Sequence, residues 1–431
     1  MPANACGEQD KSCVSRTRAG FRKACTCVLA CSAALAVIFA ADGALASGYS
    51  IVHNFAGSPD GSAPGAAMIM DSTGNLYGTT FEGGTGTNCT RGCGTVFKIS
   101  TKGKKTILYS FQGNTDGAGP SSRLIRDKAG NLYGTTEYGG DGIDCTNCGT
   151  VFKLAPDGTE AVLNQFVAGT DGAAPTGDLV MDGKGNLFGT TSAGGGSMNC
   201  TEGCGTVYED VVGGDEKVLY AFTGGNDGSG PTSGLMQDAK GNFYGTTYSG
   251  GANNLGTVFK LSRVQGVWKE KVLHSFKGSE GSAPATGVIA DTAGNLFGTT
   301  SMGAFLGTGC SQGCGTVFEL TTGGTVKTLH AFKGPNKDGA LAGGDLVRDG
   351  AGNLYAITLE GGAKNMGTVF KLAPGGTLTL LHSFGTITND GGFPLSALVA
   401  NPTGRLFGTT YAGGSSTNCS GGCGTVFSIN E

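Results

Sequence analysis

The sequence is poor in charge, histidine and tryptophan, and it lacks any helical repeat pattern. Only 14% of its 431 residues are charged, and it contains four His and one Trp. Beyond residue 46 the acidic residues outnumber the basic ones, so no basic patch remains that could hold nucleic acid. The absence of a sustained 3.6-residue apolar period excludes helical bundles and helical solenoids.

A long apolar run is also missing after residue 46. The one such run, ACTCVLACSAALAVIFAA at 24–41, follows four basic residues, and Ala44-Leu45-Ala46 then precedes Ser47. This order predicts a secretory signal over residues 1–46, cleaved near Ala46-Ser47. A retained N-terminal membrane anchor is the alternative, because the run is nearly long enough to span a bilayer. We therefore expect a secreted or periplasmic protein with no membrane span in the mature chain.

Glycine, by contrast, is abundant, with 82 residues, and the chain also has 22 Phe and 11 Tyr. Enough apolar and aromatic side chains are present to fill a core, which argues against disorder. Glycine is costly inside helices and useful in tight turns. The composition therefore favours turn-rich β structure.

Internal repetition is the main pattern. The motif G-N-[LF]-[YF]-G-T-T, with two weaker copies, begins at seven positions: Gly74, Gly130, Gly185, Gly241, Gly294, Gly352 and Gly404. Each unit of about 55 residues reads as four short strands separated by turns, as in GDLVMD, GNLFGTT, GTVYED and KVLYAF. Seven such units predict a seven-bladed β-propeller of four-stranded antiparallel blades, which forms a single domain over residues 47–431.

The phase of the repeat predicts how the ring closes. Residues 51–55, IVHNF, match the fourth strand of the other units, whereas the chain ends on a third strand, GTVFSINE. We expect the strand at 51–55 to complete the last blade, which would leave no exposed sheet edge. We also expect a monomer.

Two aromatic positions per unit are assigned to packing between blades. The first set is Phe55, Phe111, Phe166, Phe222, Phe276, Phe332 and Phe384, and the second is Phe97, Phe152, Tyr208, Phe259, Phe318, Phe370 and Phe427. The glycine of the G-T-T motif is expected to let neighbouring sheets approach closely. It is present at Gly78, Gly134, Gly189, Gly245, Gly298 and Gly408.

The unit GNLYGTT…GG…GTVFKL resembles the GloVer tandem repeat of bacterial choice-of-anchor proteins, over nearly all of residues 51–431. The resemblance implies a secreted, propeller-like repeat protein of a kind that usually has no assigned activity.

Five units carry a cysteine pair in the loop between the second and third strands. The pairs are Cys89/Cys93, Cys145/Cys148, Cys200/Cys204, Cys310/Cys314 and Cys419/Cys423. Two units lack both cysteines, which indicates that the two sulfurs depend on each other, and in a secreted protein a disulfide is the default. A zinc site is the rival, although each pair lies on a different blade and no histidine is nearby. A redox-active pair at Cys145 and Cys148 is a further alternative.

The connection from each blade to the next carries one acidic residue in the pattern [DE]-G-x-x-P, on the same face as the cysteine loops. The acids are Asp60, Asp116, Asp171, Asp227, Glu280, Asp338 and Asp390. The layout is similar to that of calcium-dependent lactonase and phosphotriesterase propellers, and oxygen ligands suit Ca²⁺. The alternative is that each carboxylate only closes a turn by accepting backbone N–H bonds. Calcium is the only cofactor that the pattern raises.

Two functions follow as hypotheses. The first is a secreted binding or scaffold module that contacts a protein or a glycan through its loop face, and a purely structural envelope protein is not distinguished from it. The second is a Ca²⁺-dependent hydrolase or lyase with its site at the acidic mouth of the channel. The four His residues occupy one repeat position, so none is singled out as a catalytic base, and we predict no catalytic residue.

Overall fold

The computed structural model describes residues 48–140, 148–211, 213–304 and 309–430, and these residues form strands and turns without a helix. The predicted signal segment, residues 1–46, lies outside the described residues. None of the described segments is a helix long and apolar enough to cross a membrane.

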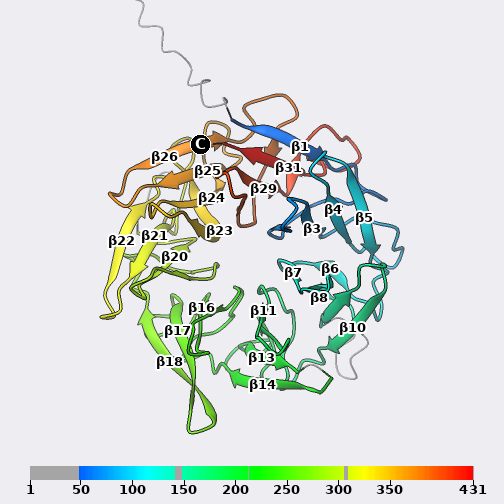
Figure 1. The fold of residues 1–431 in the computed structure, drawn as a ribbon. Helices are drawn as coiled ribbons and strands as arrows, with labels where there is room; N and C mark the ends of the chain where they lie inside the picture. Colours follow the sequence, from blue (N-terminus) through cyan, green and yellow to red (C-terminus); the bar gives the residue numbers. More distant parts are fainter. Residues whose placement is uncertain (1–47, 141–147, 212, 305–308, 431) are drawn as a thin grey trace, which may run out of the picture. The chain divides into compact units, whose positions relative to one another are not determined.

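The strands form seven antiparallel blades around a ring, which confirms the predicted propeller (Figure 1). Blade 1 consists of β2 (Ile69–Met70), β3 (Leu76–Thr80), β4 (Thr95–Ile99) and β5 (Lys105–Ser110). Blade 2 consists of β6 (Ala118–Pro120), β7 (Ile125–Arg126), β8 (Leu132–Tyr138), β9 (Thr150–Leu154) and β10 (Glu160–Gln165). Blade 3 consists of β11 (Val180–Met181), β12 (Leu187–Thr191), β13 (Thr206–Asp210) and β14 (Glu216–Ala221).

The remaining blades follow the same order. Blade 4 consists of β15 (Met236–Gln237), β16 (Phe243–Thr247), β17 (Thr257–Val264) and β18 (Val267–Ser275). Blade 5 consists of β19 (Ile289–Ala290), β20 (Leu296–Thr300), β21 (Thr316–Leu320) and β22 (Val326–Ala331). Blade 6 consists of β23 (Ala340–Arg348), β24 (Leu354–Glu360), β25 (Thr368–Leu372) and β26 (Leu378–Ser383).

Blade 7 joins the two ends of the chain. It consists of β28 (Val399–Ala400), β29 (Leu406–Thr410), β31 (Thr425–Ile429) and the N-terminal strand β1 (Ser50–Asn54), and a small ribbon of β27 (Gly391–Gly392) and β30 (Ala412–Gly413) lies beside it. Strand β1 pairs antiparallel with β31, with Ile51 opposite Phe427 (Figure 1). The predicted closure of the ring is confirmed.

Each blade starts from a hairpin that its own sequence specifies. In DSTGN the Asp71 carboxylate accepts hydrogen bonds from the backbone N–H groups of Thr73 and Asn75, at 3.0 and 2.9 Å. Gly74 has a φ of 85°, a conformation that glycine adopts at little cost. The turn therefore fixes the register of β2 against β3.

Pairs of aromatic rings join the blades, as predicted. The ring after the outer strand of one blade meets the ring on the third strand of the next blade edge to face, with centroids 5.0–5.3 Å apart. All seven interfaces have such a pair, and Phe55 with Phe97 is the one next to the closure. These rings are almost wholly buried.

The glycines of the G-T-T motif were expected to let neighbouring sheets approach closely, but they make a different contact. Gly78 lies directly opposite Phe97 of the same sheet, and a Cβ on Gly78 would come within 2.7 Å of that ring. The close approach is therefore between a glycine and a cross-strand aromatic ring of its own blade, rather than between two sheets. The space left by the glycine lets the ring reach the blade interface.

Candidate functional site

The seven acidic residues of the blade connections each bind a partner at their own blade interface. Asp116 accepts hydrogen bonds from the backbone N–H groups of Gln112 and Gly113, at 2.7 and 3.1 Å, and from the Tyr109 hydroxyl at 3.0 Å. Asp338 accepts from the Lys333 N–H at 2.7 Å and lies 2.9 Å from Nε2 of His330. The carboxylates of Asp116 and Asp338 thus each close a turn and tie it to the outer strand of the preceding blade.

At six of the seven blade interfaces, the side chain that contacts the acid is a Tyr or a His from the preceding blade. The residue two positions before the buried Phe reaches the acid through its hydroxyl or imidazole nitrogen: His53, Tyr109, Tyr220, His274, His330 and His382. At the seventh, between blades 2 and 3, the equivalent residue is Asn164. The four histidines, which share one repeat position, therefore have a common structural contact.

At four interfaces a second residue, from the outer strand of the following blade, adds a charged or titratable group. At Asp60 this residue is Lys105, whose Nζ lies 2.8 Å from the carboxylate. Burial alone would raise the pKa of Asp60, but its bonds to His53 and Lys105 hold that pKa down at about 2. The interface is a buried ion pair.

In three consecutive blades the equivalent residue is itself acidic. Burial, reinforced by the charge of Asp116, raises the pKa of Glu160 to about 7, and burial with Asp227 does the same for Glu270. Burial together with Asp171 and Asp210 raises the pKa of Glu216 to about 8. Carboxyl groups that face each other in a partly buried site cannot all ionise easily.

These acids are not gathered into one mouth of the channel. Within the described ranges, no group of three or more His, Cys, Asp or Glu side chains is arranged to hold a metal ion. The structure brings each acid to its own partner and spreads the seven around the ring, so they do not present a shared set of ligands in the channel.

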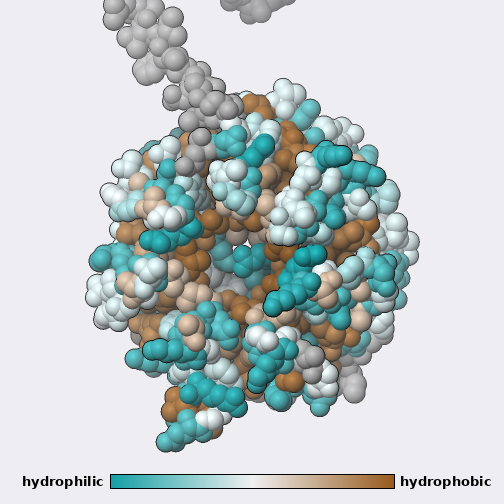
Figure 2. All heavy atoms as spheres, in the orientation of Figure 1, coloured by the Kyte–Doolittle hydropathy of each residue, from teal (hydrophilic) through white to brown (hydrophobic). Residues whose placement is uncertain are grey.

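The channel wall has a charged trio that the sequence analysis missed. Arg123 Nε lies 3.2 Å from Asp178 Oδ2, and Asp178 Oδ1 accepts the backbone N–H of Arg123 at 2.7 Å. Asp345, in blade 6, accepts the backbone N–H of Gly287 at 2.7 Å. Asp178 and Asp345 help to line a cavity of about 130 Å³. Figure 2 shows hydrophilic atoms in the central hollow.

A signal for this trio was present in the repeats. The position just before the inner-strand apolar residue is small in the other four blades, at Ala67, Gly234, Gly287 and Ala397, and is charged only at Arg123, Asp178 and Asp345. Comparing the repeats at this position would have revealed the break in symmetry.

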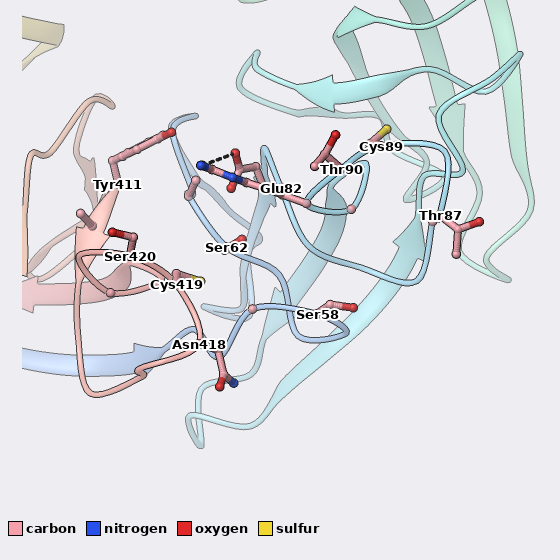
Figure 3. Close-up of a pocket in the computed structure, with 17 residues that line it drawn as sticks. Ser58, Ser62, Glu82, Thr87, Cys89, Thr90, Tyr411, Asn418, Cys419 and Ser420 are labelled. Atoms are coloured by element: carbon pink, nitrogen blue, oxygen red, sulfur yellow. Dashed lines mark hydrogen bonds and ion pairs between the residues drawn. The ribbon is translucent and has the colours of Figure 1, made fainter.

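A hollow of about 720 Å³ lies on the loop face between blades 7 and 1 (Figure 3). Ser58 and Ser62, from the blade connection, and the cysteine loops of both blades line it, so the two kinds of loop share one face as predicted. Tyr411, 38% exposed, turns its hydroxyl toward Glu82 across the groove. Arg91 pairs with Glu82 at 3.3 Å.

Disulfides form part of both walls of this groove. The structure bonds the sulfurs of four predicted pairs: Cys89–Cys93, Cys200–Cys204, Cys310–Cys314 and Cys419–Cys423. The predicted pair Cys145/Cys148 lies partly outside the described residues, because Cys145 falls in the 141–147 gap. The groove thus runs between two stapled loops, which carry the polar side chains of Thr87, Thr90, Asn418 and Ser420.

Some solved structures are similar to this chain at low sequence identity. The extracellular domain of a hybrid two-component system from B. thetaiotaomicron is similar over 86% of this chain, with 12% identity and a TM-score of 0.50, and a second such domain from the same organism is similar over 88%, with 11% identity and a TM-score of 0.51. The chain spans 39% of the length of each. A gluconolactonase from Xanthomonas campestris is similar over 88% of this chain and 89% of its own, with 12% identity and a TM-score of 0.43.

No curated protein matches the sequence. The model of the Gloeobacter/Verrucomicrobia repeat matches three segments, 32–201, 196–310 and 302–431, which together cover every blade. The repeat motif, the seven blades and this match agree, and the chain belongs to the Gloeobacter/Verrucomicrobia repeat family.

Proposed function

We propose that the propeller is a glycan-binding module that works outside the cytoplasm and takes its ligand in the groove between blades 7 and 1. The observation that carries the proposal is the groove itself. It combines an exposed aromatic ring, Tyr411, with hydroxyl and amide groups, between walls that disulfides hold in place.

The chemistry of the groove suits a sugar ring. A sugar presents hydroxyl groups at its edge and C–H groups on its faces, so it needs hydrogen-bonding side chains around one flat aromatic surface. Ser420, Thr87 and Thr90 supply hydroxyls, and the Glu82–Arg91 pair supplies an acceptor and a donor of opposite charge. The groove has no excess of either charge, which favours an uncharged ligand over an anionic one.

The location follows from the cysteines. Disulfides persist in oxidising compartments and are rare in the cytosol. Together with the predicted signal over residues 1–46, they support a role for the domain at the cell envelope or outside the cell.

The test is binding to a panel of immobilised glycans, followed by calorimetry with the best ligand. We expect Tyr411→Ala to weaken the affinity about tenfold or more, because it removes the stacking surface. Tyr248→Ala is the matched control, since Tyr248 occupies the same repeat position in blade 4 and is also 38% exposed, but lines a different groove. Equal loss in both variants, or no glycan bound by the unaltered protein, would contradict the proposal.

A further inference from the structure

The hairpin of β17 and β18 in blade 4 is longer than the equivalent strand pair of any other blade. β17 has eight residues and β18 has nine, whereas the third strands of the other blades have five residues and the fourth strands have five or six. The added length extends outward from the ring (Figure 1). Six blades form without such an extension, so its surface is available for another role.

The extension ends in a tight turn that holds two valines together. Val264 is directly opposite Val267 in the strand pairing. Between them, Gln265 has a φ of 52° and Gly266 a φ of 85°, and positive φ at both central residues is typical of a two-residue type I′ turn. Arg263 Nε donates a hydrogen bond to the Gly266 carbonyl at 3.0 Å. The turn therefore presents the valine pair at the tip, where the two side chains are 44% and 61% exposed.

One face of the hairpin anchors it to its own blade. Trp268 packs on Phe243 with ring centroids 5.6 Å apart, and the Arg263 guanidinium lies 5.9 Å from the Trp268 ring. Leu261, on the same face, is fully buried. Because alternate residues of a strand point to opposite sides of a sheet, the residues between these form an outer face. The outer face consists of Lys260, Ser262, Val264, Val267, Lys269 and Lys271.

The three lysines of the outer face have no acidic partner. Lys260 is directly opposite Lys271, and like charges in directly opposite positions of a sheet are destabilising. The equivalent pair in blades 1, 2, 3, 5 and 6 contains a single Lys, opposite Thr, Ala or Glu. In the part of the chain that the structure describes, no ion pair joins Lys260, Lys269 or Lys271 to an acid. This face is therefore a local basic exception in a chain with more acidic than basic residues beyond residue 46.

The base of the outer face borders open space. Lys260, Ser262 and Lys271 form one wall of a hollow of about 450 Å³, and the blade 5 turn at 321–324 lines the other side. Ammonium and hydroxyl groups are hydrogen-bond donors that suit the oxygen atoms of an anionic group. An anionic group thus has room to reach the opposed lysines.

Apolar and basic side chains follow one another in a fixed order from the tip. A strand rise of about 3.4 Å per residue places Lys269 about 7 Å and Lys271 about 13 Å behind the valine pair. Elements that lie on a membrane bury apolar side chains about 5–10 Å into the headgroup boundary, and their Lys and Arg side chains are attracted to anionic lipids. An anionic polysaccharide would contact the lysines but leave the valines in water.

We propose that the outer face of this hairpin binds the surface of an anionic lipid bilayer. Val264 and Val267 enter the headgroup layer, and the three lysines contact the lipid phosphates. The proposal does not rest on the glycan groove, which lies between blades 7 and 1, on the other side of the ring from blade 4 (Figure 1). A bilayer bound at the hairpin leaves that groove open.

The experiment uses the predicted mature chain, residues 47–431, with vesicles of phosphatidylglycerol and phosphatidylcholine in equal amounts. Pure phosphatidylcholine vesicles are the neutral comparison. We expect cosedimentation with the anionic vesicles, at least tenfold weaker binding to the neutral ones, and weaker binding at high salt, because salt screens the surface potential. A chain that does not bind the anionic vesicles would overturn the proposal.

The fluorescence of Trp268 shows where the chain meets the vesicle, because it is the one Trp in the sequence. Trp268 directly follows Val267 of the tip, so lipids with a nitroxide on the headgroup should quench its fluorescence when the hairpin is bound. Binding without quenching would place the contact elsewhere on the propeller and overturn the assignment.

Two double variants test the two parts of the outer face. Val264→Ser with Val267→Ser removes the apolar tip, and we expect about tenfold weaker binding. Lys269→Gln with Lys271→Gln removes two charges, and we expect about thirtyfold weaker binding, about fivefold for each lysine. All four side chains are exposed, so both variants should fold. A tip variant that binds as well as the unaltered chain would contradict insertion of the valines.

The matched control is Lys102→Gln with Lys104→Gln, in the equivalent turn of blade 1. Both lysines are exposed and the change in net charge is the same, so binding should stay nearly unchanged. Equal loss in the two lysine variants would mean that only the net charge matters, which contradicts a site on the hairpin. Dextran sulfate is the second probe. If it binds through Lys269 and Lys271 while the vesicles do not bind, the partner is an anionic polymer and the lipid assignment is wrong.

Discussion

At the scale of single residues, each cysteine pair occupies the space that an apolar side chain occupies in the units without cysteines. A Cβ on Gly224 would come within 2.7 Å of both sulfurs of the Cys200–Cys204 bridge. In the sixth unit, which has no cysteines, a Cβ on Gly385 would meet the Met366 sulfur at 2.5 Å. The disulfide and the methionine thus occupy equivalent places, which explains why both cysteines of a pair are absent together.

Removal of one bridge tests this structural role. We expect the double variant Cys200→Ser, Cys204→Ser to lose about 2 kcal/mol of stability, a drop in Tm of about 2–3 °C, because it releases a short loop. Thermal unfolding followed by circular dichroism measures the shift. Met198→Ala in the same loop is the control, since Met198 is 96% exposed, and it should leave the Tm unchanged. A bridge variant as stable as the unaltered protein would contradict the role.

At the scale of elements, the blade interfaces differ in how they hold their acids. The interface at Asp60 has a lysine and a histidine, whereas those at Asp116 and Asp227 each oppose a second carboxyl group, Glu160 or Glu270. The two glutamates must keep a proton to avoid a buried negative pair. The interfaces at Asp116 and Asp227 should therefore lose stability as the pH rises toward 7.

The direction of the pH effect follows from the raised pKa values. Glu160 and Glu270 titrate at about 7 in the folded protein and at about 4.3 when unfolded, so the folded state binds more protons between these values. Stability should then fall as pH rises from about 4.5 to about 7. We expect Glu160→Gln to be more stable than the unaltered protein at pH 8, by about 1 kcal/mol after allowance for solvent screening, and equal to it at pH 4.5.

Chemical denaturation at the two pH values measures this difference. The substitution Glu319→Gln is a suitable control, because Glu319 pairs with Lys327 on the outside of blade 5 instead of facing an acid. If Glu160→Gln lowers the free energy of unfolding by the same amount at pH 4.5 and pH 8, the Glu160 carboxyl group is not protonated at the blade interface.

At the scale of the whole molecule, one N-terminal strand closes the ring. Besides the pairing of β1 with β31, the Tyr49 ring stacks on His382 of blade 6 at 3.7 Å, and its hydroxyl donates to Asp390 at 2.7 Å. Phe55, fully buried, continues the same segment against blade 1. The seven residues from Tyr49 to Phe55 therefore join the last blade to both of its neighbours.

Truncation tests the closure. A chain that starts at Gly57 lacks β1 and Phe55, and we expect its Tm to be at least about 5 °C below that of a chain that starts at Gly48, because burial of one Phe alone contributes about 3–5 kcal/mol. Calorimetry compares the two chains. Equal melting temperatures would mean that the ring does not depend on this strand.

The number of blades, their four-strand pattern and the closure of the ring could be predicted from the sequence, because these features follow from repeated local signals. The D-x-x-G-N turns, the alternating strands and the phase of IVHNF each act within a few residues of chain. The aromatic pairs were predictable for the same reason, since a residue repeated in every unit has the same surroundings in each.

At the positions where the repeats differ, the contacts of each residue depend on the tertiary structure. Arg123 and Asp345 are on different blades, so no local pattern relates them. The groove at Tyr411 likewise needs blade 7 to lie beside blade 1, although the two are at opposite ends of the chain. The physical reason is ring closure, which places side chains together by position around the circle and not by distance along the sequence.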